Sequence, residues 1–226
     1  MALKKIVLIP LLLAAVALTA VLLRSGDTER KALPVSGLPW QIDLLPDGNS
    51  KVFGLTLTQS TLGDAREHFG PDMEIAVIAR REETGSLEAY YGRVTTGVLT
   101  GKMILVTDLD KESVERMRQH AGKSTYTESS AKKYTLSPED LALAYSAPIG
   151  SITFIPSASL DEETALARFG PPGERIRVSE QVEHLLYPGK GLAITLDKKG
   201  KELLQYVAPR NFARLRDPLL SQRKAN

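Results

Sequence analysis

The feature that most constrains the fold is a seven-residue pattern that occurs twice. Residues 65–71 read Ala-Arg-Glu-His-Phe-Gly-Pro, and residues 165–171 read Ala-Leu-Ala-Arg-Phe-Gly-Pro, one hundred positions later. Around each stretch apolar residues recur three and four positions apart, the glycine can take the left-handed position after a helix, and the proline forbids continuation. Such self-similarity predicts two copies of one unit, each with a helix that ends at the same Phe-Gly-Pro stop.

Extended segments flank both predicted helices. Segments 52–57 and 151–155 precede them, Ser60 or Thr61 opens the first helix, and Ser159 with Glu162 fits a capping box for the second. Strand-like stretches follow each helix and predict antiparallel sheet in both copies; they cover residues 73–79, 87–91 and 98–107, then 175–178, 182–187, 192–196 and 203–207.

The two copies are not identical. Residues 111–120 form an amphipathic helical pattern where the second copy has its last strand, and the polar segment 122–133 is expected to be a loop. Ser137 followed by Pro138 predicts a further helix that stops before Pro148. Residues 40–45 and the turn after them predict a strand and hairpin in front of the first copy.

Composition describes an ordinary folding chain. The 226 residues carry 29 basic and 27 acidic side chains, a formal charge of +2 that gives no support to a nucleic-acid partner. The absence of cysteine excludes disulfides, thiolate metal sites, cysteine nucleophiles and lipid attachment through cysteine.

An apolar stretch near the start of the chain predicts a membrane anchor. Residues 6–23 carry no charge and lie between basic residues. As a helix of about 1.5 Å rise per residue they would be roughly 27 Å long, close to the thickness of a bilayer core. We predict a transmembrane signal anchor at residues 1–24 with a cytoplasmic N-terminus, then a juxtamembrane linker at residues 25–37. A cleaved signal peptide, cut after Ala15-Val16-Ala17, is the alternative.

The order of helix, Phe-Gly-Pro stop, tyrosine (Tyr90-Tyr91 or Tyr187), apolar strand and Asp197-Lys-Lys-Gly200 turn resembles a known module. It is similar to the helix-plus-sheet unit of the BamE (SmpA/OmlA) outer-membrane assembly lipoproteins and of the β-lactamase-inhibitor proteins, over residues 52–110 and 150–207. The resemblance implies tandem modules that bind or scaffold proteins in a bacterial envelope. Those lipoproteins are anchored by an acylated cysteine, which this chain lacks, and the matching positions are structural, so no functional residue is transferred.

A strand that ends in Asp108-Leu-Asp110 is the sharpest catalytic candidate. It resembles the nucleophile motif of haloacid-dehalogenase phosphatases, which implies two aspartates acting as nucleophile and acid/base partner beside magnesium. Glu112 departs from that motif, and the downstream lysine and paired acids are missing. The alternative is that both carboxylates end a strand and cap the helix that begins at Lys111.

The remaining motifs are incomplete. Gly122-Lys123-Ser124 lacks the upstream glycine of a phosphate-binding loop, and there is no Gly-x-Ser-x-Gly elbow. His68, His120 and His184 do not have the spacing of a zinc site. We therefore predict no catalytic, cofactor-binding or metal-binding residue, and the sequence leaves a small-molecule ligand undetermined.

Together these features predict an α+β protein: an N-terminal transmembrane helix, then two tandem helix-plus-antiparallel-sheet modules at residues 38–135 and 136–208. Residues 209–226 are expected to be a solvated basic tail, or alternatively a contact for anionic lipid or an acidic partner. The expected function is a binding or scaffolding domain on the periplasmic side of a bacterial inner membrane, with another envelope protein as partner. A secreted inhibitor or ligand-binding protein, and a metal-assisted phosphatase using Asp108 and Asp110, are the alternatives.

Overall fold

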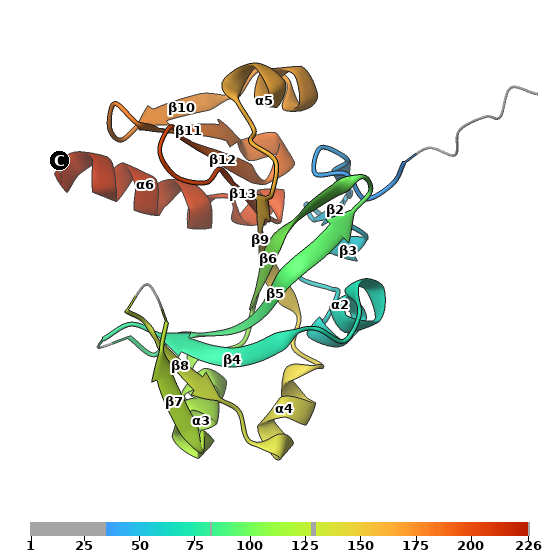
Figure 1. Cartoon of the computed structure of the whole chain (residues 1–226), viewed down its shortest axis with the longest axis vertical. Helices are drawn as coiled ribbons and strands as arrows, with labels where there is room; N and C mark the ends of the chain where they lie inside the picture. The colour runs from blue at the N-terminus through green and yellow to red at the C-terminus, as the bar shows by residue number, and fades with distance from the viewer. Residues whose placement is uncertain (1–34, 82, 128–129, 226) are drawn as a thin grey trace, which may run out of the picture. The chain divides into compact units, whose positions relative to one another are not determined.

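The computed structural model describes residues 35–81, 83–127 and 130–225 (Figure 1). Residues from Val35 onward form one compact unit. Its helices are α2 (Leu62–Phe69), α3 (Lys111–His120), α4 (Pro138–Ala144), α5 (Glu162–Phe169) and α6 (Ala213–Ala225), with short 3-10 turns η2 (Pro188–Lys190) and η3 (Pro209–Asn211). Its strands are β1 (Asp43–Leu44), β2 (Ser50–Val52), β3 (Leu55–Thr56), β4 (Glu74–Ala79), β5 (Ser86–Thr96), β6 (Leu99–Thr107), β7 (Lys123–Tyr126), β8 (Lys132–Thr135), β9 (Ile149–Pro156), β10 (Glu174–Arg177), β11 (Val182–Tyr187), β12 (Leu192–Asp197) and β13 (Leu203–Val207).

Ten of these strands form one antiparallel sheet in the order β10-β11-β12-β13-β9-β6-β5-β4-β8-β7. Two meanders, β4-β5-β6-β9 and β10-β11-β12-β13, meet at its centre, where four residue pairs from Leu204↔Phe154 to Val207↔Ser151 join β13 to β9. The fourth strand of each meander pairs with the fourth strand of the other. This strand order is the one expected for two copies related by a two-fold axis.

Both meanders share a contact between the preceding helix and the second strand. The hydroxyl of Tyr91 in β5 donates a hydrogen bond to the Gly70 carbonyl at 3.3 Å, and that of Tyr187 in β11 donates to the Gly170 carbonyl at 3.1 Å. Each tyrosine ring also packs against the phenylalanine that precedes the glycine. The Phe-Gly-Pro repeat thus places the same helix end against the same strand in each half.

The core lies on both faces of the sheet. Neighbouring residues of a strand point to opposite faces, so Leu185 and Leu186 of β11 enter different clusters. The larger cluster joins the sheet to α2, α3, α4, α5 and the three-stranded sheet β1-β2-β3. The smaller one packs α6 on the second meander and contains Ile176, Leu186, Ala193, Val207 and Phe212, with Leu215, Leu219 and Leu220 against them.

The first meander carries an insertion that the second lacks. Between β6 and β9 the chain forms α3, β7, β8 and α4, whereas residues 198–202 alone join β12 to β13. Strand β8 pairs with β4 and β7 pairs with β8, so the insertion also extends the sheet.

The expected fold class is corrected on two points. The strands do not form separate modules at residues 38–135 and 136–208, because β9, expected to open the second copy, pairs with β6 on one side and β13 on the other. No helix within the described residues is long and apolar enough to cross a membrane. The predicted anchor at residues 1–24 lies outside them. The fold class with a transmembrane helix and the single-pass inner-membrane location are corrected accordingly.

Several local predictions also differ from the structure. Residues 209–226, expected to be a solvated tail, contain α6, whose leucines pack on the sheet. Segment 122–133 contains β7 and the start of β8, because the edge of β4 is available for pairing. Segment 52–57 turns at Phe53-Gly54 instead of running straight.

The helix caps were predicted in part. Thr61 caps α2 in a capping box with Asp64, and Ser137 caps α4 with Pro138 in its first turn, as expected. Asp161, rather than Ser159, caps α5. Gly70 and Gly170 have positive φ but extended ψ, so neither adopts the left-handed helical conformation.

Candidate binding site

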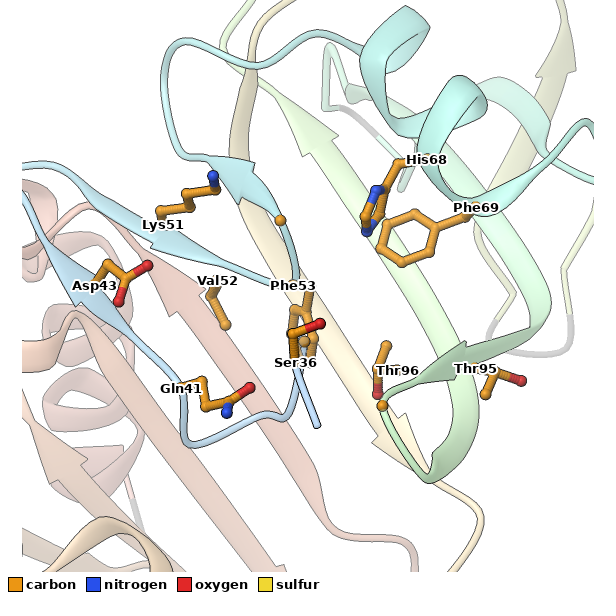
Figure 2. A pocket seen from close by; sticks show the side chains of 13 residues that line it. Ser36, Gln41, Asp43, Lys51, Val52, Phe53, His68, Phe69, Thr95 and Thr96 are labelled. Atoms are coloured by element: carbon orange, nitrogen blue, oxygen red, sulfur yellow. The ribbon is translucent and has the colours of Figure 1, made fainter. Parts of the chain in front are cut away.

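A hollow of about 610 Å³ lies beside the end of the β5–β6 hairpin (Figure 2). We call residues 92–100 of this hairpin the arm and the hollow the arm pocket. Its walls come from the loop before β1, the sheet β1-β2-β3, the end of α2 and the arm. This volume lies within the roughly 300–1,000 Å³ typical of ligand pockets.

The β2–β3 turn forms a strained wall of the arm pocket. Phe53 and Gly54 link Val52 to Leu55 with φ of +54° and +83°, and a two-residue type I′ turn needs positive φ at both positions. Phenylalanine rarely adopts this conformation. Burial holds it there, since the Phe53 ring lies 5.3 Å from the rings of both Phe154 and Tyr206.

The end of α2 faces this turn. In Figure 2 the ring of His68 points from the helix towards the turn, beside the ring of Phe69. The two rings meet edge to face with centroids 4.6 Å apart. A Cβ atom on Gly54 would lie only 2.8 Å from the His68 imidazole, so a larger residue would require this exposed ring to shift, and the φ of +83° favours glycine at this position.

The arm leaves one edge of β5 unpaired. Strand β4 pairs with β5 only as far as Tyr90, whereas β5 continues to Thr96 (Figure 1). The carbonyl of Thr100, opposite Thr95, accepts a hydrogen bond from Ser157 on the other side of the arm. Thr95 and Thr100 therefore form a pair without mutual backbone bonds, and the N–H and C=O of Thr95 point away from β6. Among the described residues no backbone group pairs with this edge.

The arm turn is held by the loop before β1. Gly97 has φ of +61°, and a Cβ atom there would come within about 3 Å of Val35, Ser36 and Leu38. The side chain of Gln41 fixes that loop, since its Oε1 accepts from the Leu38 N–H at 2.9 Å and its Nε2 donates to the Val35 carbonyl at 2.8 Å.

Thr96 lines the arm pocket and has an unsatisfied hydroxyl. The residue is 3% exposed, and its Oγ1 is the one buried side-chain polar atom without a hydrogen-bond partner in the part of the chain that the structure describes. Leaving a buried hydroxyl unpaired costs about 1–3 kcal/mol. Native proteins rarely tolerate this cost without a reason.

The arm pocket is lined by one acidic and one basic side chain. Asp43 and Lys51 stand opposite each other in the β1–β2 register. Neither makes an ion pair within 4.0 Å with any residue that the structure describes. Together with His68 and hydroxyls at Ser36, Thr95 and Thr96, they make a polar lining against the ring of Phe69.

The catalytic candidates of the sequence lie elsewhere. Asp110 caps α3, and its hydrogen bond from the Ser113 backbone N–H at 2.8 Å lowers the pKa of this carboxyl. Asp108 accepts a hydrogen bond from Arg214 of α6 at 2.6 Å and fills the space beside Gly150. The helix-capping interpretation of Asp110 is confirmed.

The three histidines lie in different environments. His120 lies 3.2 Å from the carboxylate of Asp140, whereas His184 is buried, contacts Thr195 Oγ1 at 2.9 Å and has a pKa lowered by burial. Only His68 lines the arm pocket. The described residues contain no group of three or more acids and histidines that could hold a metal ion.

Sequence reasoning missed Thr95 and Thr96. The expected strands ended at Tyr91 and restarted at Val98, although a glycine between β-rich segments is a hairpin signal. Loop 35–41, which lies against Gly97 next to the buried Thr96, reaches the arm from outside the local sequence.

Comparisons with known proteins found no matching protein-family model, no similar curated protein and no similar solved structure.

Proposed function

We propose that this chain is a non-catalytic binding protein that takes an extended segment of another polypeptide along the free edge of β5 in the arm. The observation that supports this is the outward direction of the Thr95 backbone groups, for which the described part of the chain supplies no partner. An unpaired edge is a template for an added strand, whose main chain supplies affinity while alternate side chains enter neighbouring pockets.

The edges of the sheet differ in how they are protected. Three of the four residues of β10 are charged, and ion pairs join Glu174, Arg175 and Arg177 to neighbouring side chains. Charged residues on an edge discourage strand addition. The arm edge has one charged residue, Arg93, which forms no ion pair within the described residues. The arm edge is therefore less protected against strand addition than the β10 edge.

The contacts of the two aspartates favour binding over the phosphatase alternative. Asp110 is engaged as a helix cap, and Asp108 is paired with Arg214. A nucleophile and acid/base pair would need both carboxylates free to reach a substrate.

The test is selection of binders from a phage-displayed library of random twelve-residue peptides on the purified full chain. Thr95→Pro removes the outward N–H without removing a bond to β6, and proline is tolerated at such edge positions. We expect the best enriched peptide to bind Thr95→Pro at least ten-fold more weakly than the unaltered chain, measured by fluorescence anisotropy.

The matched control is Ser124→Pro in β7, the other exposed edge strand. The Thr127 N–H bonds to the Ala131 carbonyl, so the alternation of the β7–β8 ladder turns the Ser124 N–H outward as well. We expect this variant to bind within two-fold of the unaltered chain. N-methylation along the peptide should abolish binding at alternate residues only.

Three outcomes contradict the proposal. They are equal binding by Thr95→Pro, loss of binding in Ser124→Pro alone, and dimerisation that Thr95→Pro abolishes in the absence of peptide binders. The third outcome would assign the edge to a second copy of the chain.

A further inference from the structure

The unsatisfied hydroxyl of Thr96 identifies what the arm pocket would recognise. Thr96 precedes the turn of the arm, and its neighbour Thr95 carries the outward backbone groups of the free edge. A strand added at Thr95 would lie beside the arm pocket, and its side chains would alternate between the pocket and solvent. The orphan hydroxyl and the free edge are independent observations that meet at the same place.

The lining defines the chemistry of the group that would bind. Asp43 and Lys51 contribute opposite charges, so the pocket gives no net preference to an anion or a cation. The hydroxyls of Ser36 and Thr96 donate and accept hydrogen bonds, and the Phe69 ring offers an apolar surface. This combination suits an uncharged hydrogen-bonding group on a short carbon stem.

We infer that the arm pocket receives one uncharged polar side chain of the bound segment, a hydroxyl or a carboxamide, and that the Thr96 hydroxyl hydrogen-bonds to it. The inference rests on the proposed function, because it names the residue class read within the same bound segment. The Thr96 Oγ1 atom is covered in the unbound structure. The inference therefore requires residues 36 and 37, which lie between the two backbone groups that Gln41 holds, to move when the side chain enters.

Two substitutions separate the hydroxyl from the shape of Thr96. Thr96→Val keeps the volume and removes the hydroxyl, whereas Thr96→Ser keeps the hydroxyl and removes a methyl group. If the hydroxyl serves the bound segment and not the fold, Thr96→Val raises the melting temperature of the free chain and weakens binding. A merely structural threonine would not move these two quantities in opposite directions.

The experiment repeats the peptide selection with the full chain and these variants. We expect the enriched peptides to share one position occupied by Ser, Thr, Asn or Gln. Thr96→Val should weaken binding at least ten-fold and Thr96→Ser by less than three-fold. Replacing the shared residue by Val or Leu should weaken binding to the unaltered chain but not to Thr96→Val.

The outcomes distinguish this inference from the proposed function. Unchanged binding by Thr96→Val, or a charged residue at the shared position, overturns the inference while loss of binding in Thr95→Pro upholds the edge. A selection that gives no binder above the Thr95→Pro background overturns the proposed function, and the inference with it.

Discussion

Replacing Tyr91 and Tyr187 by phenylalanine tests whether the two halves are copies built into one cooperative sheet. The Tyr91 hydroxyl is buried, and its single proton is shared between two carbonyls, those of Ala65 at 3.1 Å and Gly70 at 3.3 Å. The Tyr187 hydroxyl donates to one, that of Gly170 at 3.1 Å. A hydrogen bond contributes about 0.5–1.5 kcal/mol net, and a buried partner left unpaired adds to the loss.

We therefore expect the free energy of unfolding to fall by about 2 kcal/mol in Tyr91→Phe and by about 1 kcal/mol in Tyr187→Phe. For a unit of this size each kcal/mol lowers the melting temperature by about 2–4 °C. The two losses should add within about 0.5 kcal/mol in the double variant, because the sites share no partner. Urea titration followed by circular dichroism and by Trp40 fluorescence measures them.

A single unfolding transition is part of the expectation, because β9 and β13 join the halves into one sheet. Two separate transitions, or a larger loss in Tyr187→Phe than in Tyr91→Phe, would refute the reasoning. The pH dependence gives a second readout. Burial raises the pKa of Tyr91 to about 12, so its contribution is present below pH 10 and is lost as pH rises from 10 towards 12. Tyr91→Phe should lose less stability over that range.

Two further predictions concern single residues. Gly54→Ala should destabilise the fold by about 1–3 kcal/mol, because Gly54 has positive φ and the added Cβ atom would lie 2.8 Å from the His68 ring. Gly189→Ala has open space and should stay within about 0.5 kcal/mol in the same urea titration. Burial lowers the pKa of His184, so its contribution is complete above pH 6.5 and is lost as pH falls below it, by at most about 1.4 kcal/mol per pH unit. His184→Gln should therefore lose less stability between pH 7 and pH 5 than the unaltered chain, and equal losses would contradict the assignment.

Local signals explain what could be predicted from the sequence. Helix α3 occupies residues 111–120 as its apolar spacing indicated, with Asp110 as cap. Strands β11 and β13 have the expected bounds, because turn residues delimit them. These features depend on neighbours a few positions away.

Pairing between distant segments explains what could not. The repeat predicts that the segment before α5 opens the second copy, but this segment is β9, whose place in the sheet is set by β6 and β13. The leucines of α6 alternate with basic residues and give a weak amphipathic pattern in the sequence. Their burial becomes clear only from the smaller core cluster, against which they pack. The arm pocket is formed by loop 35–41, α2 and the arm. These segments are distant in the sequence, and no periodic pattern of residues indicates that they lie together.

The insertion between β6 and β9 has a consequence for synthesis on the ribosome. Residues 108–148 separate the two strands, so at about 5–20 residues per second the nascent chain presents β6 for roughly 2–8 s before its neighbour emerges. The second meander, over residues 174–207, is translated with no such delay. The N-terminal half is accordingly the part of the newborn polypeptide whose sheet edge waits longest for its neighbour.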